Sequence, residues 1–463
     1  MKLKSAVENL IWPAIQSGRA AELSALQRQF DASQWWSEEK LQEMQWRQLT
    51  ALANHAYHQV PFYHGRLRKA GFKPGQPMNA DIWAQLPALT RADVRDLGEK
   101  LHAKTYPPSF GPVMEATSGG STGIPVRVRK TGIDGIFWES NALREEFWHR
   151  DNVEGTLASV KGIAGDLYRT LSQHPSVKKI AGGIVLPDYG PPLSHICKTG
   201  PLGIMQPSKP QAEIIQFLLE IEPDYLLMRP AGLRLLLAHC HEHKIRLPSL
   251  RSVWTISECV DAELRAACQE ILGCKIVSNY SASETGYMAV QCPENIHYHV
   301  MAESCKLEVV DHDTKPCLAG SIGRVLITPL HNFATPLLRY EIGDEAEVGN
   351  ACSCGRGLPV LNDIVGRTSN YITLKTGVRQ RVDLSHYRIS ALRSIREFQL
   401  VQTSLETLKL RLAVTSAFTA TDRETVQSLL NQQFGRHFTC DIEILESIAK
   451  TPSGKLLQFV SEL

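Results

Sequence analysis

The sequence lacks the features expected of a protein that is embedded in a membrane or binds nucleic acid. No stretch of its 463 residues approaches the roughly 18 consecutive apolar residues that a helix needs to span a bilayer. Neither sign of charge is in excess, because 50 lysines and arginines stand against 48 acidic residues and the net charge is +2. A surface balanced in this way gives no electrostatic reason to expect a nucleic acid or a lipid surface as partner. The composition therefore favours a small-molecule partner.

The N-terminus also lacks the character of a secretory signal. It reads MKLKSAVENLIWPAIQSGRAAEL, with two lysines but without an apolar run of about 7–15 residues or a small-residue cleavage site. Eleven cysteines, an odd number, are scattered between Cys197 and Cys440, which argues against a secreted disulfide framework. We therefore expect a cytoplasmic protein whose cysteines are mostly buried thiols.

The middle of the chain alternates between strand and helix patterns. The strand patterns are at 182–187, 251–257 and 274–281, and the helix patterns are at 212–221, 231–243 and 261–272. Such alternation predicts an α/β fold with a largely parallel sheet. Two further strand patterns, 305–311 and 323–330, predict a smaller β region.

The two ends of the chain differ from the middle. Residues 1–60 have mainly helical patterns, with Ser37 as a cap and Pro61 as a stop, and a further helix is expected over Arg91–His102 with Thr90 as its cap. After Gly366 the chain predicts strands at 370–375, 396–402, 408–414 and 440–446, with one helix at 422–434 that has Thr421 near its start. We therefore predict an N-terminal region, residues 1–365, and a small α+β C-terminal domain, residues 366–463.

Residues 117–125 read TSGGSTGIP and are rich in glycine and hydroxyl side chains. Glycines permit the backbone conformations in which successive N–H groups converge on an anion. The stretch lacks the Gly-Lys-Ser/Thr ending of the nucleotide P-loop, and the residues after it alternate like a strand. Taken alone, it is equally compatible with a phosphate loop and with a polar hairpin turn.

Four other segments decide between these alternatives by a resemblance. They are NYSASETG (279–286), RYEIGD (339–344), VGRTSNYI (365–372) and TPSGK (451–455). In this order, together with TSGGSTGIP, they resemble the motifs of the adenylate-forming superfamily of acyl-CoA synthetases, luciferases and peptide-synthetase adenylation domains. HQVPFYHGRLRKAG (58–71), LPALTRADVR (86–95) and CSCGRGLP (352–359) resemble its phenylacetate–CoA ligase-like branch, which includes capsular-polysaccharide-type relatives.

The resemblance implies both a fold and a reaction. The fold would be a large, multi-layer α/β region with mixed or parallel sheets and a small β region, followed by a mobile α+β C-terminal domain. The reaction would be ATP-dependent adenylation of a carboxylic acid with release of pyrophosphate, with Mg²⁺ as cofactor. The acyl group would then pass to coenzyme A. Two alternatives stay open: an acyl-AMP ligase that forms an amide or loads a carrier protein, and a catalytically silent, zinc-stabilised interaction protein.

The resemblance also implies roles for individual residues. The loop would wrap the β- and γ-phosphates with Thr117, Ser118, Gly119, Gly120, Ser121, Thr122 and Gly123. Glu284 would hold magnesium, and Ser283 would contact the α-phosphate. Tyr280 would lie against the adenine, and Ser257 and Glu258 would line the base pocket.

The remaining roles fall on the ribose, the hinge and the C-terminal domain. Asp344 would accept hydrogen bonds from the ribose hydroxyls, and Arg367 would reach the ribose or a phosphate. Ser369 occupies the hinge position, where the family usually has aspartate or lysine, which puts the extent of domain rotation in doubt. Lys455 would enter the site and bridge the carboxylate and the α-phosphate; a long, flexible ammonium suits this role.

A possible zinc site is separate from these motifs. Cys352 and Cys354 form a Cys-x-Cys pair, and QCPENIHYHV supplies Cys292, His297 and His299. A set of Cys292, His299, Cys352 and Cys354 would be a Cys₃His combination, which is typical of structural zinc. We prefer His299 to His297 on the resemblance. Buried free thiols beside a surface histidine are the alternative.

The acid substrate is not identified by the sequence. Trp138, Phe147, Trp148 and Tyr189 follow the glycine-rich loop and are candidates for holding an aryl acid, or equally for the core. No cation in this region stands out as a partner for a second carboxylate. The acyl acceptor and the oligomeric state have no signature either.

Overall fold

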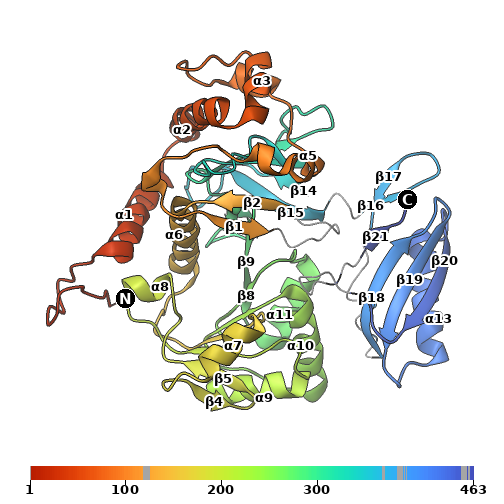
Figure 1. Ribbon diagram of the computed structural model, residues 1–463. Helices are drawn as coiled ribbons and strands as arrows, with labels where there is room; N and C mark the ends of the chain where they lie inside the picture. Colours follow the sequence, from red (N-terminus) through yellow and green to blue (C-terminus); the bar gives the residue numbers. More distant parts are fainter. Residues whose placement is uncertain are drawn as a thin grey trace. The chain divides into compact units, whose positions relative to one another are not determined.

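The computed structural model describes residues 2–117, 126–367, 371–382, 389, 392, 394–449, 456 and 459–463. These form two compact units. The larger unit comprises Met1–Ala116, Val128–Ile342 and Ala346–Val365, and the smaller comprises Thr117–Arg127, Gly343–Glu345 and Gly366–Leu463. Each unit is described below by itself (Figure 1).

The elements up to residue 367 are helices and strands in alternation. The first are α1 (Gly18–Ser33), α2 (Glu38–Gln59), α3 (Pro61–Lys69), α4 (Ala80–Gln85), α5 (Arg91–Leu97) and the short 3-10 helices Gly98–Leu101 and Pro108–Phe110. They are followed by β1 (Met114–Thr117), β2 (Arg127–Lys130), α6 (Gly132–His149), β3 (Leu157–Val160), α7 (Gly165–Ser172), β4 (Lys178–Ile180), β5 (Gly183–Leu186), α8 (Leu193–Ile196), β6 (Leu202–Ile204), α9 (Gln211–Ile221), β7 (Tyr225–Met228), α10 (Pro230–His243), β8 (Ser252–Thr255) and α11 (Ala262–Leu272). The last are β9 (Lys275–Ala282), β10 (Gly286–Gln291), β11 (Tyr298–Val300), β12 (Cys305–Val310), β13 (Ile322–Pro329), β14 (Tyr340–Val348) and β15 (Val360–Arg367).

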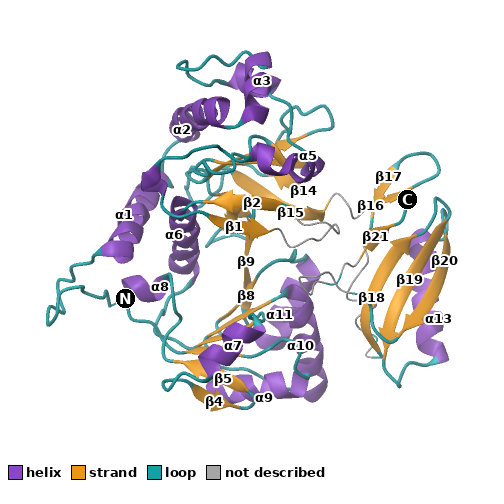
Figure 2. Cartoon of the chain, in the orientation of Figure 1, coloured by secondary structure: helices purple, strands orange, loops and turns teal. Residues whose placement is uncertain are grey.

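One large mixed sheet is the centre of this part of the chain. Its described strands follow the order β12-β13-β14-β15-β11-β10-β9-β8-β7-β3-β6-β5-β4. Figure 2 shows the strands in orange and the helices in purple. Strands β6, β3, β7, β8 and β9 run parallel, as the alternating pattern predicts. The strands predicted as a smaller β region, β12 and β13, form one end of this same sheet. The α/β fold class inferred from the sequence is confirmed.

Helices α9, α10 and α11 pack on the parallel strands through one continuous apolar core. Phe217 of α9, Leu236 of α10 and Cys268 of α11 are fully buried in this core, together with Leu226 of β7 and Val253 of β8. Helices with a single apolar stripe must bury it against such a face. This explains why strands with almost continuous apolar runs lie between amphipathic helices in the sequence.

The predicted helix starts are confirmed, but one helix is shorter than predicted. The Ser37 side chain accepts a hydrogen bond from the Lys40 N–H, and Thr90 forms a capping box with Asp93. Helix α5 ends at Leu97 and not at His102, because Gly98 has a φ of 48° and leaves the α-helical conformation. Ahead of α1, no described residue is helical.

The smaller unit contains a β-hairpin and a four-stranded mixed sheet. Its elements are β16 (Tyr371–Thr373), β17 (Arg379–Arg381), β18 (Ile395–Gln402), β19 (Thr407–Val414), α13 (Ala420–Phe434), β20 (Thr439–Leu445) and β21 (Phe459–Ser461). The sheet order is β20-β19-β18-β21, and α13 connects the parallel strands β19 and β20. The strand–strand–helix–strand order matches the α+β prediction. The helix begins slightly earlier than predicted, at Ala420 with Thr419 as its cap, and Thr421 lies near its start.

Truncating the core of the parallel sheet should destabilise the larger unit. Leu226 is fully buried in β7, so Leu226→Ala should lower the free energy of unfolding by about 2–5 kcal/mol through lost burial and the cavity that remains. Leu219→Ala on α9 is the matched control, because Leu219 is 46% exposed. Denaturant titration measures both. Equal losses in the two variants would contradict the assignment of β7 to the core.

Candidate functional site

Glu284 lies in the turn between β9 and β10, two strands that pair antiparallel. Its side chain is buried, and Oε1 lies 3.5 Å from Nη1 of Arg91 on α5. A carboxylate is expensive to bury unless it is paired or binds a cation. One long ion pair leaves carboxylate oxygens available for a hard cation such as Mg²⁺. The position therefore fits the magnesium ligand inferred from the sequence.

Thr285, the next residue, was not singled out by the sequence. Its hydroxyl oxygen is buried and has no hydrogen-bond partner among the described residues. Burying a hydroxyl without a hydrogen-bond partner is unfavourable in free energy. The position therefore indicates a place where a ligand or a water molecule supplies the missing hydrogen bond. The only signal in the sequence is that Thr285 directly follows Glu284.

Ser257 and Tyr280 lie at the same edge of the parallel sheet. Thr255, the last residue of β8, is paired with Ser278 of β9, so Ser257 and Tyr280 both lie two residues beyond this pair. Ligands of α/β sheets bind at the carboxyl ends of parallel strands. Ser257 is exposed and has a φ of 70°, whereas Tyr280 is buried. This edge agrees with the adenine pocket predicted from the resemblance.

Glu258 has a structural partner. Its Oε2 accepts a hydrogen bond of 3.0 Å from the Ala231 N–H at the start of α10. A carboxylate in this position satisfies an unpaired helix N–H and interacts favourably with the helix dipole. Glu258 therefore connects the loop after β8 to α10, which is a function that the sequence did not predict for it.

The other predicted residues that the structure describes lie on several different elements. Thr117 ends β1, and β1 pairs with β2 in a two-stranded sheet; Asp344 is buried in β14; and Arg367 is the last residue of β15. The rest of the glycine-rich loop, Ser118 to Gly123, lies outside the described residues. So do Ser369 and Lys455. Ser283 lies beside Glu284 in the β9–β10 turn.

Glu145 connects α6 to the hairpin that carries Glu284. Its carboxylate accepts hydrogen bonds from the Asn279 amide at 3.0 and 3.1 Å and from the Tyr287 hydroxyl at 3.1 Å. Burial raises the pKa of Glu145 to about 7, although the Asn279 and Tyr287 hydrogen bonds oppose the rise. The helix and both strands of the hairpin thus meet at one buried carboxyl group.

A small, partly open pocket lies next to this hairpin. Its walls come from β2, α6, β10, β13 and adjoining turns, and its lining residues are Lys130, Asp134, Phe137, Trp138, Asn141, Thr285, Gly286, Tyr287, Ser304, Pro329 and His331. Of the four aromatic candidates, Trp138 lines this pocket. Phe147, Trp148 and Tyr189 do not.

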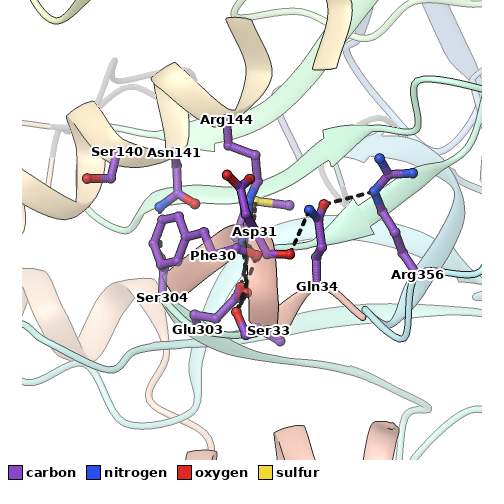
Figure 3. A network of polar contacts seen from close by, with 12 residues as sticks. Phe30, Asp31, Ser33, Gln34, Ser140, Asn141, Arg144, Glu303, Ser304 and Arg356 are labelled. Carbon is purple, nitrogen blue, oxygen red and sulfur yellow. Dashed lines mark hydrogen bonds and ion pairs between the residues drawn. The ribbon is translucent and has the colours of Figure 1, made fainter. Parts of the chain in front are cut away.

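A polar network adjoins the pocket at Asn141 and Ser304 (Figure 3). The Arg144 guanidinium of α6 donates to both carboxylate oxygens of Glu303, at 2.9 and 3.0 Å, and to the Phe30 carbonyl of α1 at 2.9 Å. The Ser33 hydroxyl donates to the same carboxylate. Burial alone would raise the pKa of Glu303, but Arg144 and Ser33 hold it below its ordinary value. This network fixes the turn before β12 against α1 and α6.

Cysteines and histidines gather where β10, β11 and the loop after β14 meet. The donor atoms of Cys292, His297, His299 and Cys352 all lie within 4.8 Å of one another. The two sulfurs are 3.8 Å apart; two thiolates about 2.3 Å from one tetrahedral zinc ion would have about that separation. Cys354 Sγ lies 3.3 Å from His299 Nε2. The structure thus brings three of the four predicted ligands together with His297, and Cys354 lies beside His299.

The histidines of this cluster are suited to binding a metal. His299 Nδ1 is 3.4 Å from the Leu358 carbonyl, which can only accept, so Nδ1 carries the proton and Nε2 is free to coordinate. Burial lowers the pKa of His299 to about 4, which keeps the ring neutral near pH 7. His297 Nε2 lies 3.0 Å from Cys352 Sγ. Asn295 donates to Cys352 Sγ, at 3.4 Å, as a neighbour that would orient a thiolate.

Known proteins resemble this chain in sequence and in fold. Residues 373–462 match the family model described as the CapK C-terminal domain. A phenylacetate–coenzyme A ligase of Thermus thermophilus is 26% identical over 353 residues, which cover 73% of this chain and 72% of that protein. Protein CapK of Staphylococcus aureus is 27% identical over 148 residues, 29% of this chain and 31% of that protein. A 2-hydroxyisobutyryl-CoA ligase structure has a TM-score of 0.66 at 17% identity and covers 92% of this chain and 91% of its own.

The sequence relatives, the family model and the shared fold agree. Together they support the adenylate-forming superfamily, and within it the phenylacetate–CoA ligase-like branch, in agreement with the resemblance of the five motifs. The same relatives support an AMP-forming ligase activity. The roles of the chain's individual site residues stay predictions. Among the described helices, none is long and apolar enough to cross a membrane.

Replacing Glu145 should change how the stability of the protein depends on pH. Because burial raises the pKa from 4.5 to about 7, the folded protein retains a proton that the unfolded chain releases. The stability contributed by this protonated group is present at low pH and is lost as the pH rises from 4.5 through about 7. The loss amounts to about 3 kcal/mol. We expect the melting temperature of the wild type to fall relative to that of Glu145→Gln over this range.

The matched control is Glu139→Gln, on the same helix but with a partly exposed carboxylate that pairs with Arg19. This variant should follow the wild-type pH dependence. If Glu145→Gln also followed the wild-type curve, Glu145 would not be the titrating group at the base of the hairpin.

Proposed function

We propose that the protein adenylates a carboxylic acid with ATP and then transfers the acyl group to coenzyme A. The observation that carries this proposal is the buried Glu284 at the tip of the β9–β10 turn, followed by the unpartnered Thr285 on the wall of a pocket. A cation-binding carboxylate and a small-molecule pocket are thereby adjacent. The similarity to the adenylate-forming superfamily supplies the reaction type.

In the first half-reaction a carboxylate oxygen of the acid attacks the α-phosphorus of ATP. The new C–O–P bond forms as the bond to the β-phosphate oxygen breaks, and pyrophosphate leaves with its electron pair. The protein has to align the attacking oxygen and to neutralise charge on the phosphates. We assign the phosphates to the loop Thr117–Gly123 and to Ser283, and the bridging of carboxylate and α-phosphate to Lys455.

Magnesium would be held by Glu284, whose buried oxygens suit a hard cation. It would neutralise charge on the leaving pyrophosphate. Tyr280 and Ser257, at the carboxyl edge of the parallel strands, would bind the adenine, with Glu258 at the start of α10. Asp344 would bind the ribose hydroxyls, because an ionised carboxylate has two oxygens that accept. Arg367 would reach the ribose or a phosphate.

In the second half-reaction the acceptor attacks the acyl carbon and AMP leaves. With coenzyme A the nucleophile is a thiolate, and the product is a thioester. We propose that the C-terminal domain, residues 366–463, moves about Ser369 between the two steps, as hinge residues do in such enzymes. The named relatives favour coenzyme A over a carrier protein or an amine. A cytoplasmic location stays a prediction.

We propose further that Cys292, His299 and Cys352 hold a structural zinc ion, with Cys354 or His297 as the fourth ligand. The support is a buried donor set of the right chemistry with sulfurs at a suitable separation. A site closed by four protein ligands has no open position, so it would stabilise the fold and would not activate water.

Acid-dependent exchange of pyrophosphate into ATP tests the proposed reaction directly. The wild type should catalyse exchange with at least one class of acid and without coenzyme A. Lys455→Ala should lower the rate on the order of 10²–10³-fold, because it removes a charge that stabilises the transition state. Lys450→Ala, five residues earlier, is the matched control and should retain exchange.

Two results would decide against parts of this proposal. A protein that is folded and binds ATP but exchanges with no acid would favour the silent, interaction-protein alternative. Exchange followed by product formation with an amine or a carrier protein, and none with coenzyme A, would favour the acyl-AMP ligase alternative.

Removing one thiolate should release the zinc. Purified wild type should contain an equimolar amount of zinc by elemental analysis, and Cys352→Ser should lose it and melt at a lower temperature, because metal binding contributes folding free energy. Cys317→Ser, a partly exposed cysteine outside the cluster, should keep the metal. Cys354→Ser and His297→Ala then identify the fourth ligand. A wild type without zinc after growth with added zinc would refute the site.

A further inference from the structure

The pocket beside the hairpin is more polar than a site for a simple aryl or alkyl acid requires. Small-molecule sites are lined mostly by apolar and aromatic side chains, with a few polar groups that set specificity. Here Phe137, Trp138, Tyr287 and Pro329 form the apolar part. The polar part has more residues and consists of Lys130, Asp134, Asn141, Thr285, Ser304 and His331.

Lys130 is the cation of this pocket. It is the last residue of β2, it is half-buried, and its ammonium nitrogen lies 5.8 Å from the centroid of the Trp138 ring. No ion pair or hydrogen bond to another described residue holds it. Burial lowers the pKa of Lys130, while Asp134 and Glu284 oppose that change electrostatically. An ammonium that is partly withdrawn from water and has no bonded acceptor attracts an anion, so the arrangement favours an anionic ligand.

Asp134 shares the pocket with Lys130 but does not form an ion pair with it. One of its carboxylate oxygens accepts hydrogen bonds from the backbone N–H and the hydroxyl of Thr131, at 2.7 and 2.9 Å, and so caps α6. The aspartate therefore acts on Lys130 through space, and no described residue accepts a hydrogen bond from the ammonium.

The residues from α6 and the turns on either side of β12–β13 add hydrogen-bonding groups with fixed roles. Asn141 donates to the Ser304 hydroxyl oxygen at 2.8 Å, so the proton of that hydroxyl can be donated elsewhere. His331 Nε2 is 2.9 Å from the Glu303 carbonyl and must donate to it, and burial lowers the pKa of His331 to about 4. The ring is therefore neutral, with Nδ1 as an acceptor. It stacks on Phe137, with the ring centroids 3.6 Å apart.

The network of Figure 3 holds these groups in place. The two-pronged contact of Arg144 with Glu303 fixes the turn that carries Ser304 and the carbonyl that binds His331. Paired hydrogen bonds of this kind restrict both distance and orientation. The pocket is thus organised before any ligand enters, which favours selection of one substrate class.

We propose that the acid adenylated by this protein carries a second carboxylate, and that Lys130 binds this second group in the pocket. The inference rests on the proposed function, since it names the substrate class of that reaction. Lys130 would be a specificity-determining residue and would take no part in the transfer of the acyl group. A monocarboxylic acid would leave the ammonium without an acceptor, whereas a dicarboxylic acid satisfies it.

The test compares acids that differ only in the second carboxylate, in the wild type and in Lys130→Met. Suitable pairs are succinate with butyrate and isophthalate with benzoate, measured by pyrophosphate exchange. The wild type should prefer the diacid in kcat/KM. Lys130→Met should reduce this preference about 10- to 100-fold, as expected for loss of a hydrogen bond to a charged group, while exchange with the monoacid is maintained or rises.

Lys306→Met is the matched control. Lys306 is also half-buried and lies over a tryptophan ring, 4.6 Å from the centroid of Trp46, but it is not among the residues that line the pocket. It should keep the wild-type preference. Melting temperatures of both variants identify any loss of folding, and ATP affinity identifies any effect on the nucleotide.

Three results would overturn the inference. The first is a wild type that exchanges with monoacids and not with diacids. The second is an equal loss for both acids in Lys130→Met, which would place Lys130 against the reacting carboxylate or the phosphates. The third is the absence of Lys130-dependent diacid binding in calorimetry. If calorimetry detects Lys130-dependent diacid binding but no acid supports exchange, the pocket assignment stands and the proposed adenylation fails.

Discussion

The pairing of Arg144 with Glu303 is the interaction on which the arrangement around the pocket depends. The guanidinium is almost completely buried, and it reaches α1 through the Phe30 carbonyl and the turn before β12 through Glu303. Removing one partner of a buried pair typically costs about 3–5 kcal/mol, because the other charge is left unpaired. Three segments that are distant in the sequence are therefore held at one point, and the wall of the pocket is built on that point.

Side chains of helix α6 contact each of the neighbouring candidate sites. Asn141 faces the pocket, Arg144 anchors the network, and Glu145 binds both strands of the hairpin that carries Glu284. Trp148, one turn further on, contacts the His299 ring in the cysteine and histidine cluster. A single helix thus connects the candidate substrate pocket, the candidate magnesium ligand and the candidate zinc cluster.

The features that could be predicted from the sequence were local ones, such as strands and helix caps, and those that belong to recognisable motifs. The parallel strands and the caps at Ser37 and Thr90 follow from periodicity and from side chains that bond to nearby N–H groups. Lys130 could not be found in this way, because its importance arises from Trp138 and from residues on β10 and β13 that the fold brings to it. His297 was set aside because the resemblance favours His299, and the spacing alone does not show that His297 approaches Cys352.

The Arg144–Glu303 pair also constrains the order in which the protein can assemble during synthesis. The two residues are 159 positions apart, so α1 and α6 leave the ribosome long before the carboxylate that pairs with them exists. Closing the two helices around the guanidinium at that stage would bury a charge without a counterion. Their final packing has to wait until the chain has passed residue 303. Helices α1 and α6 are thus synthesised early, but they reach their final packing late.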